Sequence, residues 1–262
     1  MKRKLPSESL FDIELLKAPN AFLLALEARA PWEYGASFFA TPWLRRAPAG
    51  DGHPVVVFPG LAATDTSTAP LRGFLKERGY LTKGWELKRN LGPHGGVLEQ
   101  SAARVHKLHV ETGRKVSLIG WSLGGVYARE IAKFHPNDVR CVITLGTPFT
   151  GHPKATNAWR LYQFTSGEKI DNHVLLARVR QAPPVPTTSI FSRTDGVVAW
   201  KCSLQAPSKH AESIEVIASH VGMGLNPSTW YAVADRLAQP EGAWKPFARD
   251  GWMQWMYPDP YR

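Results

Sequence analysis

Apolar residues along the chain follow two alternating patterns. Short runs rich in β-branched residues are typical of buried strands, and longer stretches with apolar positions three or four residues apart are typical of helices. Their alternation predicts right-handed strand–helix–strand crossovers, and hence an α/β fold with a mostly parallel central sheet flanked by helices. The predicted strands cover residues 54–58, 81–87, 115–119, 139–145, 187–192 and 213–218, and the main predicted helices cover residues 69–78, 97–112, 123–134 and 227–237.

An N-terminal helical segment, residues 1–52, precedes the first predicted strand and is expected to belong to a single domain, residues 1–262. Apolar positions recur at helical spacing over residues 8–29, which predicts an amphipathic helix that Pro19-Asn20 divides in two. Residues 31–52 are rich in aromatic residues and proline, which favours an extended lead into the core.

Two later stretches also fall outside the alternation. Residues 149–186, with helical patterns over 155–165 and 173–181, are too long for a simple loop and predict a small cap over the sheet edge. The tail, residues 240–262, carries six aromatic residues and would favour association if exposed. We expect it to wrap back onto the body, with a dimer contact as the alternative, so the sequence leaves monomer and homodimer open.

The most informative stretch is Val116–Gly125, where a strand pattern runs into Gly120-Trp-Ser-Leu-Gly124 and then into a helical pattern. A side chain at the apex of a sharp strand-to-helix turn is strained and needs small residues two positions away on either side. The Ser122 hydroxyl would then project from the carboxyl edge of the sheet, above a helix N-terminus that favours developing negative charge. Because the pentapeptide alone also occurs by chance, Ser122 needs partners elsewhere in the chain to be a nucleophile.

A serine hydroxyl is a poor nucleophile unless a base takes its proton. Of the nine histidines, His220 is favoured because it directly follows the last predicted strand, at the edge where such a sheet places its chemistry. His53 and His135 flank elements near the opposite ends of the strands, and His106 and His109 lie on a predicted helix.

The base needs an orienting acid from the same edge of the sheet. Asp195 follows the strand over residues 187–192, although Asp-Gly is also an ordinary turn signal. Asp138 precedes its strand, and Asp65 precedes the candidate nucleophile in the chain. With Asp195 chosen, the chain order of serine, aspartate and histidine is that of one known arrangement.

A tetrahedral intermediate also needs donors for its oxyanion. One candidate is the backbone N–H of Leu123, the residue after the candidate nucleophile. The other is the N–H of Leu61, because Gly60 lets the loop after the first strand turn an amide inward.

Five pieces of sequence now follow one another between residue 54 and about residue 238: Phe58-Pro-Gly-Leu61, Gly120-Trp-Ser-Leu-Gly124, Leu145-Gly-Thr-Pro148, Ser192-Arg-Thr-Asp-Gly196 and Ser219-His220. In this order they resemble the α/β-hydrolase fold superfamily, among its bacterial lipase- and esterase-like members. The resemblance implies a catalytic triad of Ser122, Asp195 and His220, an acyl-serine intermediate, no cofactor, and a lid with the acyl pocket beneath it. Lipases usually carry His-Gly where this chain has Pro59-Gly60.

The cap is rich in apolar residues, which suits the acyl chain of a small hydrophobic ester. Trp159, Tyr162 and Phe164 are therefore candidate substrate-binding residues, unless they only pack the cap onto the body. Trp121, beside the candidate nucleophile, either lines the same pocket or packs under the sheet.

The predicted activity is hydrolysis of carboxylic esters. Acyl transfer to an alcohol or thiol would use the same triad, and a catalytically silent binding protein would use only the scaffold. A dehalogenase or an epoxide hydrolase would carry aspartate at position 122, and nothing points to the amine-binding subsite of a peptidase.

The charge and the remaining composition add limits. The formal charge is +10 and the pI is about 9.7, but the positive residues are dispersed and match no nucleic-acid motif. We therefore expect a solvated basic surface and no nucleic-acid partner, with peripheral contact to an anionic membrane surface as the alternative.

Neither of the two cysteines lies in a Cys/His cluster, so no metal site is expected. Glu8 and Asp12 interrupt the apolar core that a signal peptide needs, which favours a cytoplasmic protein.

Overall fold

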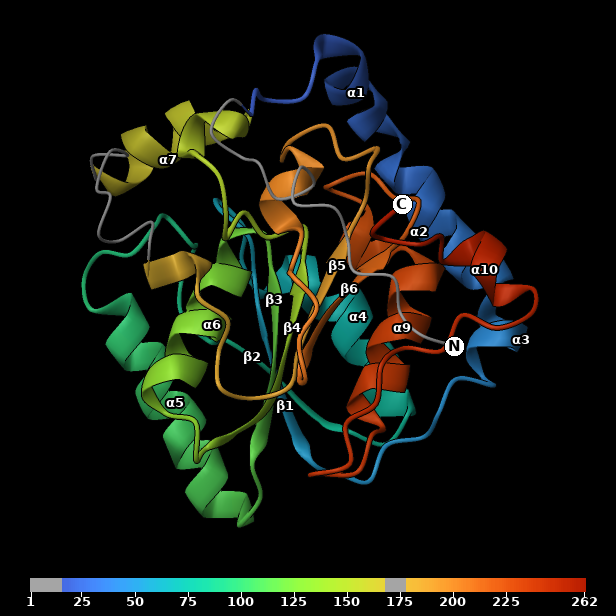
Figure 1. Cartoon of the computed structure of the whole chain (residues 1–262). Coiled ribbons are helices and arrows are strands. Elements are labelled where there is room, and N and C mark those ends of the chain that lie inside the picture. The colour runs from blue at the N-terminus through green and yellow to red at the C-terminus, as the bar shows by residue number, and fades with distance from the viewer. Residues whose placement is uncertain (1–15, 168–177) are drawn as a thin grey trace.

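A computed structural model describes residues 16–167 and 178–262. Six parallel strands form one central sheet in the order β2-β1-β3-β4-β5-β6, with helices on both faces (Figure 1). The predicted fold class is confirmed. The strands are β1 (Pro54–Phe58), β2 (Leu81–Gly84), β3 (Val116–Trp121), β4 (Val139–Leu145), β5 (Thr187–Phe191) and β6 (Ala211–Glu215).

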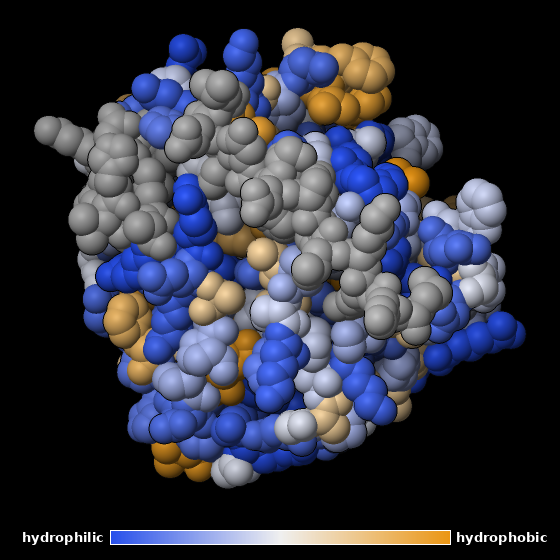
Figure 2. All heavy atoms as spheres, viewed as in Figure 1, coloured by the Kyte–Doolittle hydropathy of each residue, from blue (hydrophilic) through white to orange (hydrophobic). Residues whose placement is uncertain are grey.

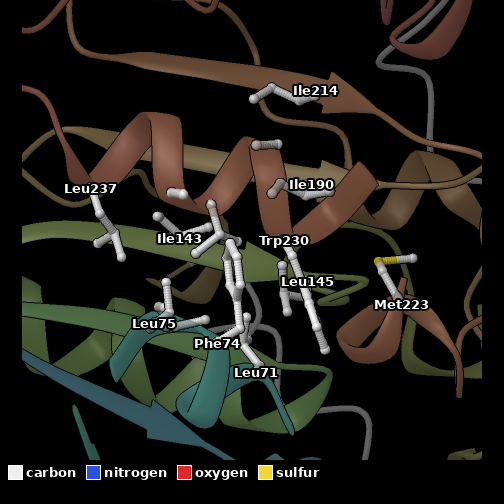
Figure 3. Close-up of a cluster of buried hydrophobic side chains, with 14 of the residues drawn as sticks. Leu71, Phe74, Leu75, Ile143, Leu145, Ile190, Ile214, Met223, Trp230 and Leu237 are labelled. Carbon is white, nitrogen blue, oxygen red and sulfur yellow. The ribbon is translucent and has the colours of Figure 1, made fainter. Parts of the chain in front are cut away.

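Alternate strand residues face two separate cores, because successive side chains of a strand point to opposite faces. Val55 and Val57 of β1 pack with helices α4 (Asp65–Glu77) and α9 (Pro227–Leu237) on one face. On this face Phe74 of α4 stacks on Trp230 of α9, with ring centroids 5.2 Å apart (Figure 3). Val56 and Phe58 of β1 pack on the other face, with helices α5 (Val97–Thr112) and α6 (Leu123–Phe134). Each of the four main helices predicted from apolar spacing thus packs on the sheet.

The N-terminal segment departs from its prediction. Asn20 caps a helix α1 (Ala21–Ala25), in agreement with the expected break, and the 3₁₀ turn η2 (Leu26–Arg29) comes next. Residues 31–52 are not extended: they contribute α2 (Ala30–Phe39) and α3 (Thr41–Leu44). A proline lies at the start of each of these helices, where its missing N–H costs nothing and its fixed φ suits the first turn. The prolines mark helix starts, and interpreting them as signs of extended chain was wrong. The predicted part of the first helix that precedes residue 16 lies outside the described residues.

The aromatic tail packs on the body, as expected. Tyr257, after the short helix α10 (Met253–Met256), is fully buried and lies against Phe247 in an edge-to-face contact. Trp252 contacts Trp43 of α3, with centroids 6.3 Å apart, so the tail also touches the N-terminal segment.

The interruption between β4 and β5 contains the short turn η3 (Pro153–Ala155) and helix α7 (Trp159–Ser166), which lies beyond the carboxyl ends of the strands in Figure 1. Most of the second predicted helix, residues 173–181, lies outside the described residues. An antiparallel bridge between Thr156 and Val198 joins this region to the loop after β5.

The surface is mainly hydrophilic on the face that Figure 2 displays, and apolar side chains gather at the end where α1 lies in Figure 1. Phe22 and Leu24 of α1 are exposed there. Among the helices of residues 16–167 and 178–262, none has the length and apolar character that crossing a bilayer requires. Peripheral contact with an anionic membrane surface stays a prediction.

Candidate active site

Ser122 stands at the sharp turn between β3 and α6. Its backbone has φ 52° and ψ −122°, one of three positive-φ non-glycine residues in the described chain. Such a conformation is strained for a residue with a side chain and persists only where the surroundings enforce it. A Cβ at Gly120 would overlap the backbone of Gly125, and one at Gly124 would overlap the carbonyl of Phe58. The two glycines of the sequence motif are therefore required by close packing, and the serine between them is half-buried with its side chain at the carboxyl edge.

His220 contacts both other candidate residues. Its Nε2 lies 3.0 Å from Ser122 Oγ, and its Nδ1 lies 2.7 Å from Asp195 Oδ2. Since a carboxylate only accepts hydrogen bonds, the pairing with Asp195 assigns the proton of the neutral ring to Nδ1. The unprotonated Nε2 then faces the serine hydroxyl and can take its proton.

Asp195 is held in place by its own loop. Its Oδ1 accepts the backbone N–H groups of Val197, at 2.8 Å, and Val198, at 2.7 Å. These bonds leave Oδ2 for His220, and the carboxyl is 3% exposed. The chain bends at Gly196 and Val197, and the two hydrogen bonds across this bend aim the carboxylate at the histidine.

The loop after β1 passes directly beside the candidate nucleophile. A Cβ at Gly60 would lie 3.3 Å from the Cβ of Ser122. Within the described chain, the N–H groups of Leu61 and Leu123 donate to no other protein group. Neither amide is committed elsewhere among the described residues, and the role of the two as oxyanion donors stays a prediction.

A family model for the alpha/beta hydrolase fold matches residues 97–255, more than half of the chain. The chain belongs to the α/β-hydrolase fold family. The matched segment contains Ser122, Asp195 and His220 and excludes both the Gly60 loop and the N-terminal helices.

Solved structures resemble this α/β hydrolase in fold. Aspergillus fumigatus lipase B has a TM-score of 0.58 and 18% identity over 76% of this chain, which spans 58% of that lipase. A second similar structure comes from work on the metagenome-derived lipolytic enzymes LipS and LipT. It has a TM-score of 0.52 and 14% identity, over 72% of this chain and 93% of that one. A monoacylglycerol lipase from Paleococcus ferrophilus has a TM-score of 0.51 and 14% identity, over 73% of this chain and 96% of that one. No curated protein matches the sequence.

Two opposing effects set the pKa of His220 in this hydrolase. Burial is the largest of the individual causes, and it lowers the pKa because it disfavours the charged ring. The charge of Asp195, the hydrogen bond to it and the charge of Glu27 act in the other direction, and together they raise the pKa above its usual value. The ring is thereby a stronger base than an isolated imidazole.

A buried asparagine that the sequence analysis missed holds the loop after β1. The Asn90 side-chain amide donates to the carbonyl of Pro59 at 2.8 Å, and its backbone pairs with Ala62 and Ala63 at 2.6 and 2.9 Å. Tyr127 donates its hydroxyl proton to Asn90 Oδ1 at 3.1 Å. Asn90 fixes the loop that presents Leu61, and no sequence motif marks it.

Trp121 packs in the core, the second of the two alternatives left by the sequence. Its side chain belongs to the cluster under the sheet and lies against Gly224. Its indole N–H donates to the carbonyl of His220 at 3.0 Å. The ring is buried and supports the histidine loop, and a role for Trp121 in substrate binding stays a prediction.

The three cap residues all lie on α7 but differ in exposure. Trp159 and Tyr162 are half-buried, whereas Phe164 is 87% exposed and lines no enclosed pocket in this conformation. A role in substrate binding stays a prediction for all three.

The histidines that the sequence analysis set aside lie elsewhere. His106 Nδ1 pairs with Asp138 Oδ2 at 2.9 Å on the α5 side. His53 is fully buried at the amino edge of the sheet, with Nδ1 2.5 Å from Asp51 Oδ1 and Nε2 2.8 Å from Ser117 Oγ. In this second Asp-His-Ser row Asp51 is exposed, but Ser117 and His53 are fully buried, so the serine hydroxyl is closed off from solvent.

Proposed function

We propose that this α/β hydrolase cleaves carboxylic esters of hydrophobic acyl groups through an acyl-serine intermediate. The observation that carries the proposal is the continuous hydrogen-bond chain from Asp195 through His220 to Ser122, which ends on a half-buried serine at a strained turn. Each of these three residues performs one task in nucleophilic catalysis.

In the first half of the reaction, Ser122 Oγ attacks the ester carbonyl carbon while His220 Nε2 takes the hydroxyl proton. The carbonyl oxygen becomes an oxyanion and accepts hydrogen bonds from the N–H groups of Leu61 and Leu123. Asp195 stabilises the imidazolium that forms. When the tetrahedral intermediate collapses, the ester C–O bond breaks, and His220 gives its proton to the leaving alkoxide, so an alcohol departs and the acyl group stays on Ser122.

In the second half, water attacks the acyl-serine and His220 takes its proton. Collapse of the second intermediate releases the carboxylic acid and returns the proton to Ser122 Oγ. Transfer to an alcohol in place of water would use the same groups, and product analysis in the presence of an added alcohol separates the two reactions.

The proposed substrate class rests on two observations. The cap beyond the carboxyl edge carries the half-buried aromatic residues Trp159 and Tyr162. Three proteins of similar fold are described as lipases or lipolytic enzymes. Both observations favour an apolar acyl group over a charged one.

Nitrophenyl esters from acetyl to palmitoyl test the proposal directly. A burst of nitrophenol and then slower turnover is expected, because acyl-serine accumulates when its hydrolysis is slower than its formation. Ser122→Ala should abolish both phases. If Trp159→Ala and Tyr162→Ala leave the chain-length profile identical to that of the surface control Phe39→Ala, the cap does not bind the acyl chain.

A further inference from the structure

The N-terminal segment reaches across the molecule to the two loops that carry Asp195 and His220. Three charged residues at its centre make the contacts, and we name them the N-terminal clamp: Glu27, Arg29 and Glu33. The clamp precedes the segment that the family model matches, residues 97–255. The clamp residues therefore lie outside the part of the chain that established the family, whereas the loops that they contact lie inside it.

One carboxylate binds both loops. Glu27 Oε1 accepts the backbone N–H of Gly196 at 2.7 Å and that of His220 at 2.9 Å. Glu27 Oε2 accepts the N–H of Val221 at 2.8 Å. Gly196 directly follows Asp195, so a single side chain fixes the spacing between the backbones of the acid and the base. Hydrogen bonds to an ionised acceptor are roughly twice as strong as neutral ones.

A second link runs in parallel with the first. Glu33 Oε1 accepts the N–H of Ser219 at 2.7 Å and the Nε–H of Arg29 at 2.8 Å. Arg29 in turn donates to the carbonyl and the hydroxyl of Thr194, at 3.0 and 2.7 Å. Arg29 and Glu33 thus link Thr194, which precedes Asp195, to Ser219, which precedes His220.

The loops are shaped to receive this segment. A Cβ at Gly196 would overlap the backbone carbonyl of Leu23 in α1, and one at Gly222 would overlap Glu33 Oε2. Glycine at both points lets the N-terminal segment approach closely, which a side chain would prevent.

We propose that Glu27 is a positioning residue for the reaction proposed above, which holds the Asp195 and His220 loops at the separation that the Ser122–His220–Asp195 chain requires. The inference rests on the proposed function. Glu27 does not touch the reacting atoms and acts through the two loops that it joins.

The charge of Glu27 gives the proposal a second, independent consequence. Charged groups on the elements packed against His220 include Asp195, which pairs with the ring, and Glu27 of the clamp. They also include two ion pairs: Arg29 with Glu33 in the clamp, and Arg193, on the Asp195 loop, with Glu215. Glu27 and Asp195 both favour the protonated ring and raise the pKa of His220 against the effect of burial. Removing the Glu27 charge should therefore lower that pKa.

Glu27→Gln removes the charge of the side chain at equal length, and Glu27→Asp keeps the charge on a shorter side chain. Glu99→Gln on the exposed surface of α5 is the matched control. Misplacing a catalytic group costs up to about 100-fold in rate. We expect kcat for ester hydrolysis to fall about 10- to 100-fold in Glu27→Gln, with a smaller change in KM, and the acidic limb of the pH profile to move to lower pH. Glu27→Asp should lose kcat because of its shorter reach but keep the limb near its original position. If kcat and the limb of Glu27→Gln equal those of Glu99→Gln, the proposal is wrong.

Titration of the His220 imidazole by NMR keeps this test distinct from that of the proposed function. It requires no turnover, so it remains decisive if the wild-type chain hydrolyses no ester. A lower pKa for His220 in Glu27→Gln than in wild type supports the clamp. An unchanged pKa with an unchanged Asp195–His220 proton resonance overturns it. If Glu27→Gln does not fold, the Asp195–His220 proton resonance is measured in Glu27→Asp instead. A chemical shift that differs from that of wild type supports the proposal, and an unchanged chemical shift overturns it.

Discussion

The indole N–H of Trp121 donates to the backbone carbonyl of His220, at 3.0 Å, across 99 residues of sequence. Trp121 directly precedes the strained Ser122, so this bond joins the strand that carries the serine to the loop that carries the histidine. The carbonyl of His220 also accepts a longer bond, of 3.4 Å, from the N–H of Met223.

Trp121→Phe keeps a ring in the core but removes this donor. We expect it to lower the free energy of unfolding by about 1 kcal/mol, the usual net value of a buried hydrogen bond, and to lower kcat by loosening His220. Urea unfolding and ester kinetics measure the two effects. The control is Trp255→Phe, because the Trp255 ring is exposed, and equal behaviour of the two variants would count against the support role.

Asp195→Asn tests the tautomer assignment. The N–H groups of Val197 and Val198 hold one oxygen, so the asparagine carbonyl stays there and its NH₂ group faces His220 Nδ1. An NH₂ group can only donate, which forces the ring proton onto Nε2 and leaves no base for Ser122. We expect kcat to fall about 10³- to 10⁴-fold in a protein that still folds. A loss no larger than that of the exposed control Asp250→Asn would show that Asp195 is not the orienting acid.

The pH dependence is set by the raised pKa of His220. The base must be neutral, so kcat/KM should rise with pH, and its midpoint should lie above the ordinary histidine value of 6.5. The sign for stability is opposite: the stabilisation from the protonated ring is fully present below 6.5 and is lost as the pH rises through the folded pKa. Steady-state kinetics across the neutral range checks the first statement, and a midpoint below 6.5 contradicts it.

A substitution at Asn90 tests whether this residue holds the loop after β1 in place. Asn90→Ala removes the donor to Pro59, so the loop presenting Leu61 should shift and kcat should fall about 10- to 100-fold. Tyr127→Phe is the matched control, because it removes only the hydroxyl that bonds to Asn90 and leaves the contact with Pro59. The two variants should differ in kcat under conditions in which urea unfolding shows both to be folded. Equal kcat values would mean that Asn90 does not position the loop.

Local patterns predicted most of the elements that position the site. Val97–Thr112, Leu123–Phe134 and Val139–Leu145 have the predicted limits, because alternation of apolar runs and helical spacing is recorded in neighbouring residues. The glycines around Ser122 likewise predicted the turn, since only glycine fits there.

Contacts between distant parts of the chain left no such record. Glu27 meets Gly196 and His220 across 169 and 193 residues, and nothing near residue 27 marks its carboxylate as a partner of those loops. Trp121 was ambiguous for the same reason, because the position of a ring above or below a sheet depends on packing from other segments. Ranges rich in proline also misled, since a proline can start a helix or lie in extended chain, and the residues after it decide between the two.

The most direct test of the central claim is labelling with a fluorophosphonate, and then peptide mapping, on the wild-type chain, Ser122→Ala and His220→Ala. The second Asp-His-Ser row provides an internal control, because Ser117 has similar partners but is fully buried and lies within a strand. The account predicts label on Ser122 alone, absent in Ser122→Ala and strongly reduced in His220→Ala. A folded wild-type protein that takes up no label, or label that persists in Ser122→Ala, would contradict it.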